Sequence, residues 1–150
     1  MGDSNFPELA GVFASLNRAW IEEFFRLEAS DLEVFGDPYR AVVAPGGQIF
    51  FAVENGVVLG TCAALRLDAD TVELAKMAVS PEVRGRGLGN LLLKAVVDFA
   101  RRTGTKRVEL LSNTRLGPAI ALYRKHGFRE IPLGQQEYSR ANIRMELLLE

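Results

Sequence analysis

Hydrophobic and polar positions along this chain follow a helical period in some segments and form short apolar runs in others. From Val12 to about Leu27, apolar residues recur every three or four positions and charged residues fill the other face, which predicts an amphipathic helix. The residues before it, to about Gly11, are expected to form a loose tail. Ser30 is the expected N-cap of a short second helix, which the sequence GDPYR ends or interrupts.

Short apolar runs in the middle of the chain predict three consecutive strands. Residues 48–68 should form two strands joined at Asn55-Gly56, the strongest short hairpin signal that a sequence offers. A third strand follows over 71–79 and closes at Ser80-Pro81. Because consecutive strands usually pair with one another, an antiparallel arrangement of the three is the simplest.

Helical periodicity returns after a glycine-rich loop. Apolar residues from Leu88 to Phe99 lie on one face of a long predicted helix that ends at Gly104. A strand over 106–113, a helix that begins near Pro118, and two strands over 128–131 and 142–150 complete the chain. The predicted fold class is a mixed α/β domain with helices packed against one sheet.

Composition narrows the class of protein. With 150 residues, 48% of them hydrophobic, the chain suits a single domain spanning residues 1–150. Its 18 Lys and Arg and 19 Asp and Glu give a net charge of -1, which argues against nucleic acid or an anionic membrane as a partner. Cys62, the single cysteine, lies in an apolar run and is expected to be a small buried residue. With no apparent signal or membrane span, we expect a cytoplasmic protein.

The loop PEVRGRGLGNLL, residues 81–92, is the first candidate for chemistry. Glycines that lead directly into a helix expose backbone N–H groups at its positive end, where phosphate oxygens bind. The alternative is a tight connection that uses glycine only for backbone freedom. The spacing does not match a P-loop, and Asn90 stands where a dinucleotide fingerprint requires its third glycine.

The spacing of Arg84, Gly87 and Gly89 after a strand ending MAV resembles motif A of the GNAT superfamily of N-acetyltransferases. The segments ELAKMAV, LLSNT and AIALYRKHGF match further elements of that family in its order, over roughly residues 57–131. The layout also resembles the acetyltransferase half of proteins in which a MarR-type regulator is fused to such a domain. The resemblance implies a three-layer domain, with helices on both faces of a mostly antiparallel sheet of about six to seven strands, and acetyl-CoA as co-substrate.

The resemblance also implies which residues bind the cofactor. Loop N–H groups would hold the pyrophosphate, the preceding strand would lie along the pantetheine arm, and a backbone N–H of the MAV segment would stabilise the oxyanion. The expected cofactor-binding residues are Met77, Ala78, Val79, Arg84, Gly85, Arg86, Gly87, Leu88, Gly89, Asn90 and Asn113. For the two arginines, phosphate pairing and a solvated surface position are both open.

Asn113 matches an asparagine that in the family bonds the pantetheine or caps the next helix. Ten positions separate it from Tyr123, several more than the family's usual spacing. The additional turn, TRLGP, puts the cofactor contact in question and offers another wall for the acceptor site.

Acetyl transfer from a thioester to an amine needs a base and a proton donor. An alkylamine with a pKa of ~10.4 is almost wholly protonated at neutral pH, so a base near it should help. Glu73 is the expected base, directly or through water, on a strand face shared with Ala75, Met77 and Val79; a solvated glutamate is the alternative. Tyr123 is the expected proton donor to the CoA sulfur, with a core tyrosine as the alternative.

Two further expectations concern histidine and metals. His126, the only histidine, is expected to end a helix as its C-cap. One histidine and one cysteine do not make a metal site, so none is expected.

The acceptor pocket in the family is built from the N-terminal helices and the loop before the last strand. The candidates for acceptor contact are Trp20, Phe24, Phe25, Tyr138 and Arg140, the last as a partner for a carboxylate. The main hypothesis is acetyl transfer from acetyl-CoA to a primary amine of a small molecule, amino acid or peptide. A non-catalytic acyl-CoA-binding or sensor module and an RNA-binding domain are the alternatives. A homodimer is a common state in the family.

Overall fold

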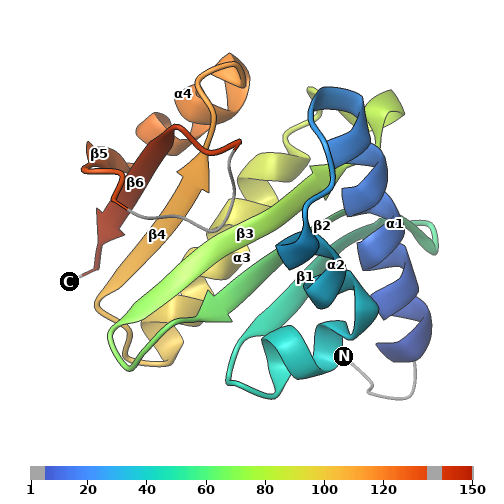
Figure 1. Cartoon of the computed structure of the whole chain (residues 1–150), viewed down its shortest axis with the longest axis horizontal. Coiled ribbons are helices and arrows are strands. Elements are labelled where there is room, and N and C mark those ends of the chain that lie inside the picture. The colour runs from blue at the N-terminus through green and yellow to red at the C-terminus, as the bar shows by residue number, and fades with distance from the viewer. Residues whose placement is uncertain (1–5, 135–139, 150) are drawn as a thin grey trace.

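One six-stranded sheet, with strand order β1-β2-β3-β4-β6-β5, organises the chain in the computed structural model, which describes residues 6–134 and 140–149 (Figure 1). Its strands are β1 Gln48–Glu54, β2 Val57–Arg66, β3 Thr71–Val79, β4 Arg107–Ser112, β5 Arg129–Ile131 and β6 Ile143–Leu148. Neighbouring strands are antiparallel, except that β3 and β4 are parallel. The predicted mixed fold and mostly antiparallel sheet are confirmed.

Helices cover both faces of the sheet, which makes the three predicted layers. The helices α1 Phe6–Phe24 and α2 Ala29–Gly36, with a π-helical turn η2 at Tyr39–Val43, enclose one apolar cluster. The helices α3 Leu88–Arg102 and α4 Gly117–Lys125 enclose the other, larger one. Among residues 6–134 and 140–149, no helix is both long and apolar enough to cross a membrane.

Local signals predicted most element boundaries correctly. Asn55 and Gly56 have φ angles of 52° and 77°, the left-handed pair that a two-residue hairpin turn requires. His126 is the C-cap of α4, and its backbone N–H donates to carbonyl oxygens of the last turn. Cys62 is fully buried, as predicted, and burial raises the pKa of its thiol to about 12. This thiol is therefore an unreactive core group.

Two predictions about the N-terminal helices are wrong. The first helix begins at Phe6 instead of near Val12, because a proline in the first turn, as at position 7, is tolerated there. Ser30 lies inside α2, and Glu28 is the N-cap. The Glu28 backbone N–H donates to the Asp31 carboxylate at 2.9 Å, so a residue held by tertiary contacts determines where this helix starts.

A bulge interrupts β3 near its middle. The register against β2 shifts there, so that Lys76 and Met77 together oppose the single residue Cys62. Lys76 has a φ of 56°, which lies in the left-handed region that residues other than glycine and asparagine rarely adopt. A bulge of this kind bends the strand and changes which way the next side chains point.

Because of the bulge, the side chains of β3 are distributed over the two faces of the sheet differently from the prediction. Met77 and Val79 pack with the cluster under α3, whereas Glu73 lies opposite Leu65, which packs with the cluster under α1 and α2. Ala75 shares the face of Glu73, as predicted. The prediction that Met77 and Val79 share it too is wrong, because one extra residue shifts the alternation by one position.

Candidate active site

A fork between β3 and β4 forms the candidate site. The two strands pair over Thr71–Glu73 and Arg107–Glu109, and then diverge toward their C-terminal ends, as Figure 1 shows. A cavity of about 360 Å³ lies at this fork. Its lining consists of Asn17, Trp20 and Ile21 of α1, Phe25 directly after this helix, residues 73–77 and Val79 of β3, Arg84, residues 111–113, Leu116 directly before α4, Pro118, Ala119, Leu122 and Tyr123 of α4, and Arg140 and Ala141.

The glycine loop lies at the end of β3, between a short 3-10 turn η3, Pro81–Val83, and α3. Gly85 and Gly87 have φ angles of 87° and 84°, which L side chains rarely adopt, and Gly87 is the N-cap of α3. The first backbone hydrogen bond of α3 runs from the Leu91 N–H to the Gly87 carbonyl, at 3.2 Å. The N–H groups of the residues in between point out of the helix end, where an anion is stabilised.

The two arginines of the loop diverge. Arg84 lines the cavity and forms a two-pronged pair with Glu23 of α1, at 3.1 and 3.0 Å. Arg86 pairs with Glu54 at the end of β1, at 3.1 and 3.0 Å. A phosphate would therefore compete with a carboxylate for either side chain, and backbone N–H groups are the better-prepared phosphate donors of this loop.

Asn90, in the first turn of α3, is tied to the end of α4. Its Oδ1 is hydrogen-bonded to Nε2 of His126. Burial lowers the pKa of His126, and the charges of Lys94 and Lys125 lower it further. The imidazole is thus held neutral near pH 7 and links the loop helix to the helix that carries Tyr123.

Glu73 and Tyr123, the predicted base and acid, both line the cavity. Glu73 is half-buried at the point where β3 and β4 begin to diverge. The Tyr123 side chain is 7% exposed and packs against Phe128, with ring centroids 6.0 Å apart. Burial raises the pKa of the Tyr123 phenol, and the adjacent Cys62 adds to the rise, so the phenol keeps its proton at any physiological pH.

Asn113 holds two segments at the end of β4. Its amide donates to the Arg140 carbonyl at 2.6 Å, and its side-chain oxygen accepts the Arg115 N–H at 2.8 Å. Of the two alternatives for Asn113, the capping of the next helix is not found, because the additional turn places Leu116 at the N-cap position. This turn lines the cavity through Leu116 and Pro118.

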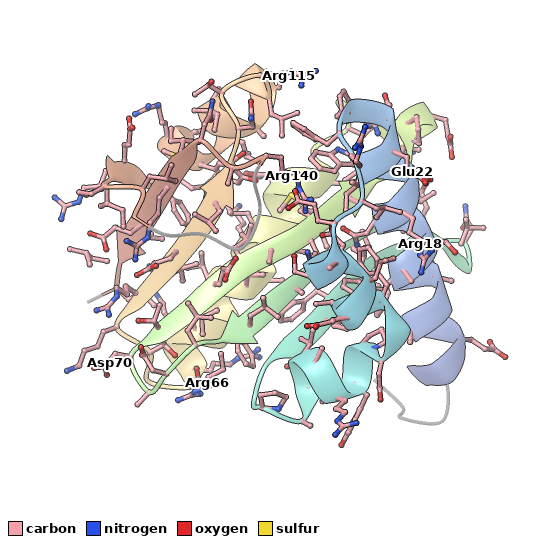
Figure 2. All side chains as sticks on the ribbon, viewed as in Figure 1. Arg18, Glu22, Arg66, Asp70, Arg115 and Arg140 are labelled. Atoms are coloured by element: carbon pink, nitrogen blue, oxygen red, sulfur yellow. The ribbon has the colours of Figure 1, made fainter. Side chains whose placement is uncertain are left out.

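The C-terminal end of α1 forms the wall of the cavity opposite α4. Trp20 and Phe25 line the cavity, while Phe24 packs against Trp20 and lies under the Arg84 guanidinium. Arg115, from the additional turn, lies 5.1 Å from the Phe25 ring centroid and bridges the two walls (Figure 2). The predicted acceptor contact at Tyr138 lies outside the described residues.

Arg140 is engaged by carboxylates of the chain itself. Its guanidinium bonds both oxygens of Asp31 at 2.8 Å and Glu28 at 3.2 Å. Figure 2 shows it between α2 and the half of the sheet that holds β4 and β6. The structure thus pairs this cation internally, which differs from the predicted pairing with a carboxylate of the acceptor.

Sequence reasoning missed the other members of this ionic cluster, Asp31 and Lys76. Lys76 Nζ lies 2.8 Å from the fully buried Asp31 carboxylate. Burial raises the pKa of Asp31, but bonds from Arg140, Lys76 and the Glu28 N–H outweigh it and lower the pKa to about 2. A lysine inside the segment LAKMAV of β3, whose other residues are apolar, was the sequence signal for this cluster.

Comparisons of the sequence with known proteins identify related acetyltransferases. The model of the acetyltransferase (GNAT) family matches residues 9–128. The N-alpha-acetyltransferase RimI of Mycobacterium tuberculosis is 31% identical over 133 residues, which cover 83% of this chain and 82% of the relative. An IAA acetyltransferase of Azospirillum brasilense is 32% identical over 93 residues, which cover 61% of this chain and 60% of the relative. The match thus spans about three fifths of the latter protein.

Solved structures share the whole fold. An acetyltransferase of the GNAT family from Staphylococcus aureus superposes with a TM-score of 0.85 at 20% identity, covering 100% of this chain and 96% of that one. The Salmonella typhimurium acetyltransferase yncA, solved with acetyl-CoA, gives a TM-score of 0.73 at 22% identity, covering 100% and 91%. The two likenesses show that the chain has the same α/β fold as these proteins. The chain belongs to the GNAT family of acetyltransferases, which confirms the resemblance seen in its sequence.

Proposed function

We propose that this chain transfers an acetyl group from acetyl-CoA to a primary amine. The observation that carries the proposal is the cavity at the β3–β4 fork, which has Glu73 and Tyr123 in its lining and an anion-binding helix end beside it. A pantetheine arm entering from the Gly85–Gly87 loop would reach both side chains along β3. The family membership and the acetyl-CoA found in yncA support the same donor.

The proposed step joins the amine nitrogen to the thioester carbonyl carbon and breaks the bond from that carbon to sulfur. Glu73, directly or through water, takes the proton that the amine must lose. A backbone N–H in the Met77–Val79 segment stabilises the negative charge on the carbonyl oxygen. Tyr123, protonated because of its burial, donates a hydrogen bond and then a proton to the departing CoA sulfur.

Acetyl-CoA binding should raise the melting temperature of the protein. At about 100 times the Kd, a ligand that binds only the folded state adds about 2.7 kcal/mol, or roughly 5–10 °C for a domain of this size. Differential scanning fluorimetry with acetyl-CoA, CoA and NAD measures it, and NAD should give no shift. Absence of a shift with both acetyl-CoA and CoA would contradict the proposal.

The loop glycines provide a matched control for that experiment. Gly87→Ala and Gly56→Ala both place a side chain at positive φ, 84° and 77°, with open space around the new Cβ. Both variants should therefore lose similar stability. Only Gly87→Ala should also reduce the acetyl-CoA shift, because Gly56 lies in the turn between β1 and β2, outside the N-terminus of α3 and outside the cavity lining.

The cavity favours an acceptor whose amine is attached to an uncharged group. Trp20, Ile21 and Phe25 form an apolar wall, and the cations Arg84 and Arg140 are paired with carboxylates of the chain. An acidic acceptor would have to lose its hydration and displace one of these carboxylates. We therefore propose an apolar or aromatic amine, or a peptide N-terminus with such a side chain.

An amine panel tests this preference. Measured as CoA released, kcat/KM for phenethylamine or a phenylalanyl peptide should exceed that for aspartate by roughly tenfold or more. A preference for aspartate or glutamate would contradict the proposed apolar acceptor. Acetyl-CoA binding without turnover on any amine would favour the sensor hypothesis instead.

A further inference from the structure

A buried ionic cluster joins three distant segments beside the cavity. Asp31 of α2 is fully buried and accepts bonds from Lys76 of β3 and Arg140 before β6, all at 2.8 Å. The Lys76 and Arg140 side chains are 4% and 16% exposed. Lys76 and Arg140 also line the cavity, whereas Asp31 lies behind them.

Stability alone is a weak explanation for such a cluster. Removing three charges from water is costly, and well-packed apolar residues of similar volume are often at least as stabilising. Lys76 adds a second cost, because its φ of 56° is unfavourable for an L residue with a side chain. Strain of this kind persists where the surroundings determine the conformation, and it gathers at functional sites.

The surroundings of Lys76 do determine its conformation. Its ammonium is held by Asp31 and lies 5.6 Å from the centroid of the Phe35 ring, both on α2. This anchoring draws the side chain toward α2, and the residue that follows, Met77, turns to the α3 face. The left-handed residue is therefore what rotates the peptide groups of the bulge at the wall of the cavity.

The same cluster spans the fork. The carbonyl of Arg140 accepts the Asn113 amide at 2.6 Å, so the end of β4 is connected through Arg140 and Asp31 to Lys76 in β3. The separation of the two diverging strands and the orientation of the bulge are thus set by one chain of contacts.

We infer that Lys76, Asp31 and Arg140 form a positioning triad, which orients the backbone N–H groups of the Met77–Val79 segment toward the thioester carbonyl. This inference rests on the proposed acetyl transfer. None of the three side chains reacts in it. Their charges hold Lys76 in its left-handed conformation, and the conformation aims the hydrogen-bond donors that stabilise the oxyanion.

Lys76 variants test the triad through the bound thioester itself. A hydrogen bond to the carbonyl of [1-13C]acetyl-CoA moves its carbon resonance downfield. In Lys76→Met this downfield shift should shrink, and kcat should fall by roughly 10- to 100-fold, since small misplacements of catalytic groups cost about that much. The Kd for CoA, which lacks the carbonyl, should stay within about twofold. Lys76→Arg, which keeps the cation, should retain most of the downfield shift and most of the wild-type kcat.

A control separates positioning from simple stability. Arg144→Met removes a partly buried cation from Glu109, 2.6 Å away, outside the cavity lining. It should lower the melting temperature but leave the carbonyl resonance and kcat unchanged. If Asp31→Asn folds, it should lower kcat and reduce the downfield shift as Lys76→Met does. If it does not fold, the Lys76 variants alone distinguish positioning from stability.

The positioning triad and the proposed acetyl transfer would be overturned by different results. If Lys76→Met lowers only the melting temperature, with wild-type kcat and carbonyl resonance, the triad is structural and the inference is overturned while acetyl transfer stands. If wild-type protein binds acetyl-CoA without turnover, the proposed function fails, and the carbonyl resonance of the variants still decides the triad. A wild-type carbonyl resonance equal to that of free acetyl-CoA overturns the triad.

Discussion

Replacing Tyr123 with phenylalanine should lower kcat by about 100-fold or more, with a change in the Kd of acetyl-CoA of no more than about twofold. The substitution removes one hydroxyl from a side chain that is 7% exposed and keeps the ring against Phe128. Packing is therefore preserved, and what is lost is the proton for the departing sulfur. Steady-state kinetics with acetyl-CoA and the best acceptor of the panel measure the effect.

The raised pKa of Tyr123 determines how activity should depend on pH. Burial increases the gap between the phenol and a thiol of pKa ~8.5, so the phenol acts as a hydrogen-bond donor that yields its proton only as sulfur becomes negative. Activity should consequently show no loss from tyrosine ionisation as pH rises to about 10. Tyr39→Phe is the matched control, because Tyr39 is 54% exposed and remote from the cavity lining. Equal kcat for Tyr123→Phe and wild type would remove Tyr123 from the mechanism.

Glu73→Gln should have the second large effect, a fall in kcat/KM of about 100-fold near pH 7 and a changed pH profile. With a carboxylate base, the amine is deprotonated inside the site, so activity should depend only weakly on the fraction of free amine that is already neutral. Without it, only amine that is already neutral reacts, so activity should keep rising toward the amine pKa of ~10.4. The measurement is kcat/KM from pH 6 to 10.

Glu109 provides the matched control for Glu73. The two glutamates are register partners on β3 and β4, but Glu109 is paired with Arg107 and Arg144 outside the cavity lining. Glu109→Gln should leave the shape of the pH profile unchanged, even if it lowers stability. An identical profile for Glu73→Gln and wild type would show that Glu73 is a structural residue.

Much of the fold was predictable because its signals are local. The hairpin at Asn55-Gly56 follows from two residues that accept positive φ, and α3 follows from apolar residues at helical spacing. The candidate base and acid were also found from sequence, since Glu73 and Tyr123 occupy positions that match a family motif. The structure places both in one cavity, although 50 positions separate them in the sequence.

Other features were not predictable from a local pattern. The face of Met77 and Val79 was mispredicted because the alternation of a strand gives no sign of an inserted residue. The partners of Arg84 and Arg140 were equally hidden, since a guanidinium binds a phosphate, a substrate carboxylate or a neighbouring glutamate with the same chemistry. Only the position of α1 and α2 over the sheet decides among these partners.

The sequence by itself determined the order of helices and strands, the place of the glycine-rich loop before α3 and the family, because spacing and turn residues act over a few positions. The tertiary structure decided the bulge in β3, the internal pairing of Arg140 and the width of the fork. Asp31, which holds Lys76, is 45 positions away in the chain, and charges attract according to distance in space. Folding alone brings them within 2.8 Å of each other.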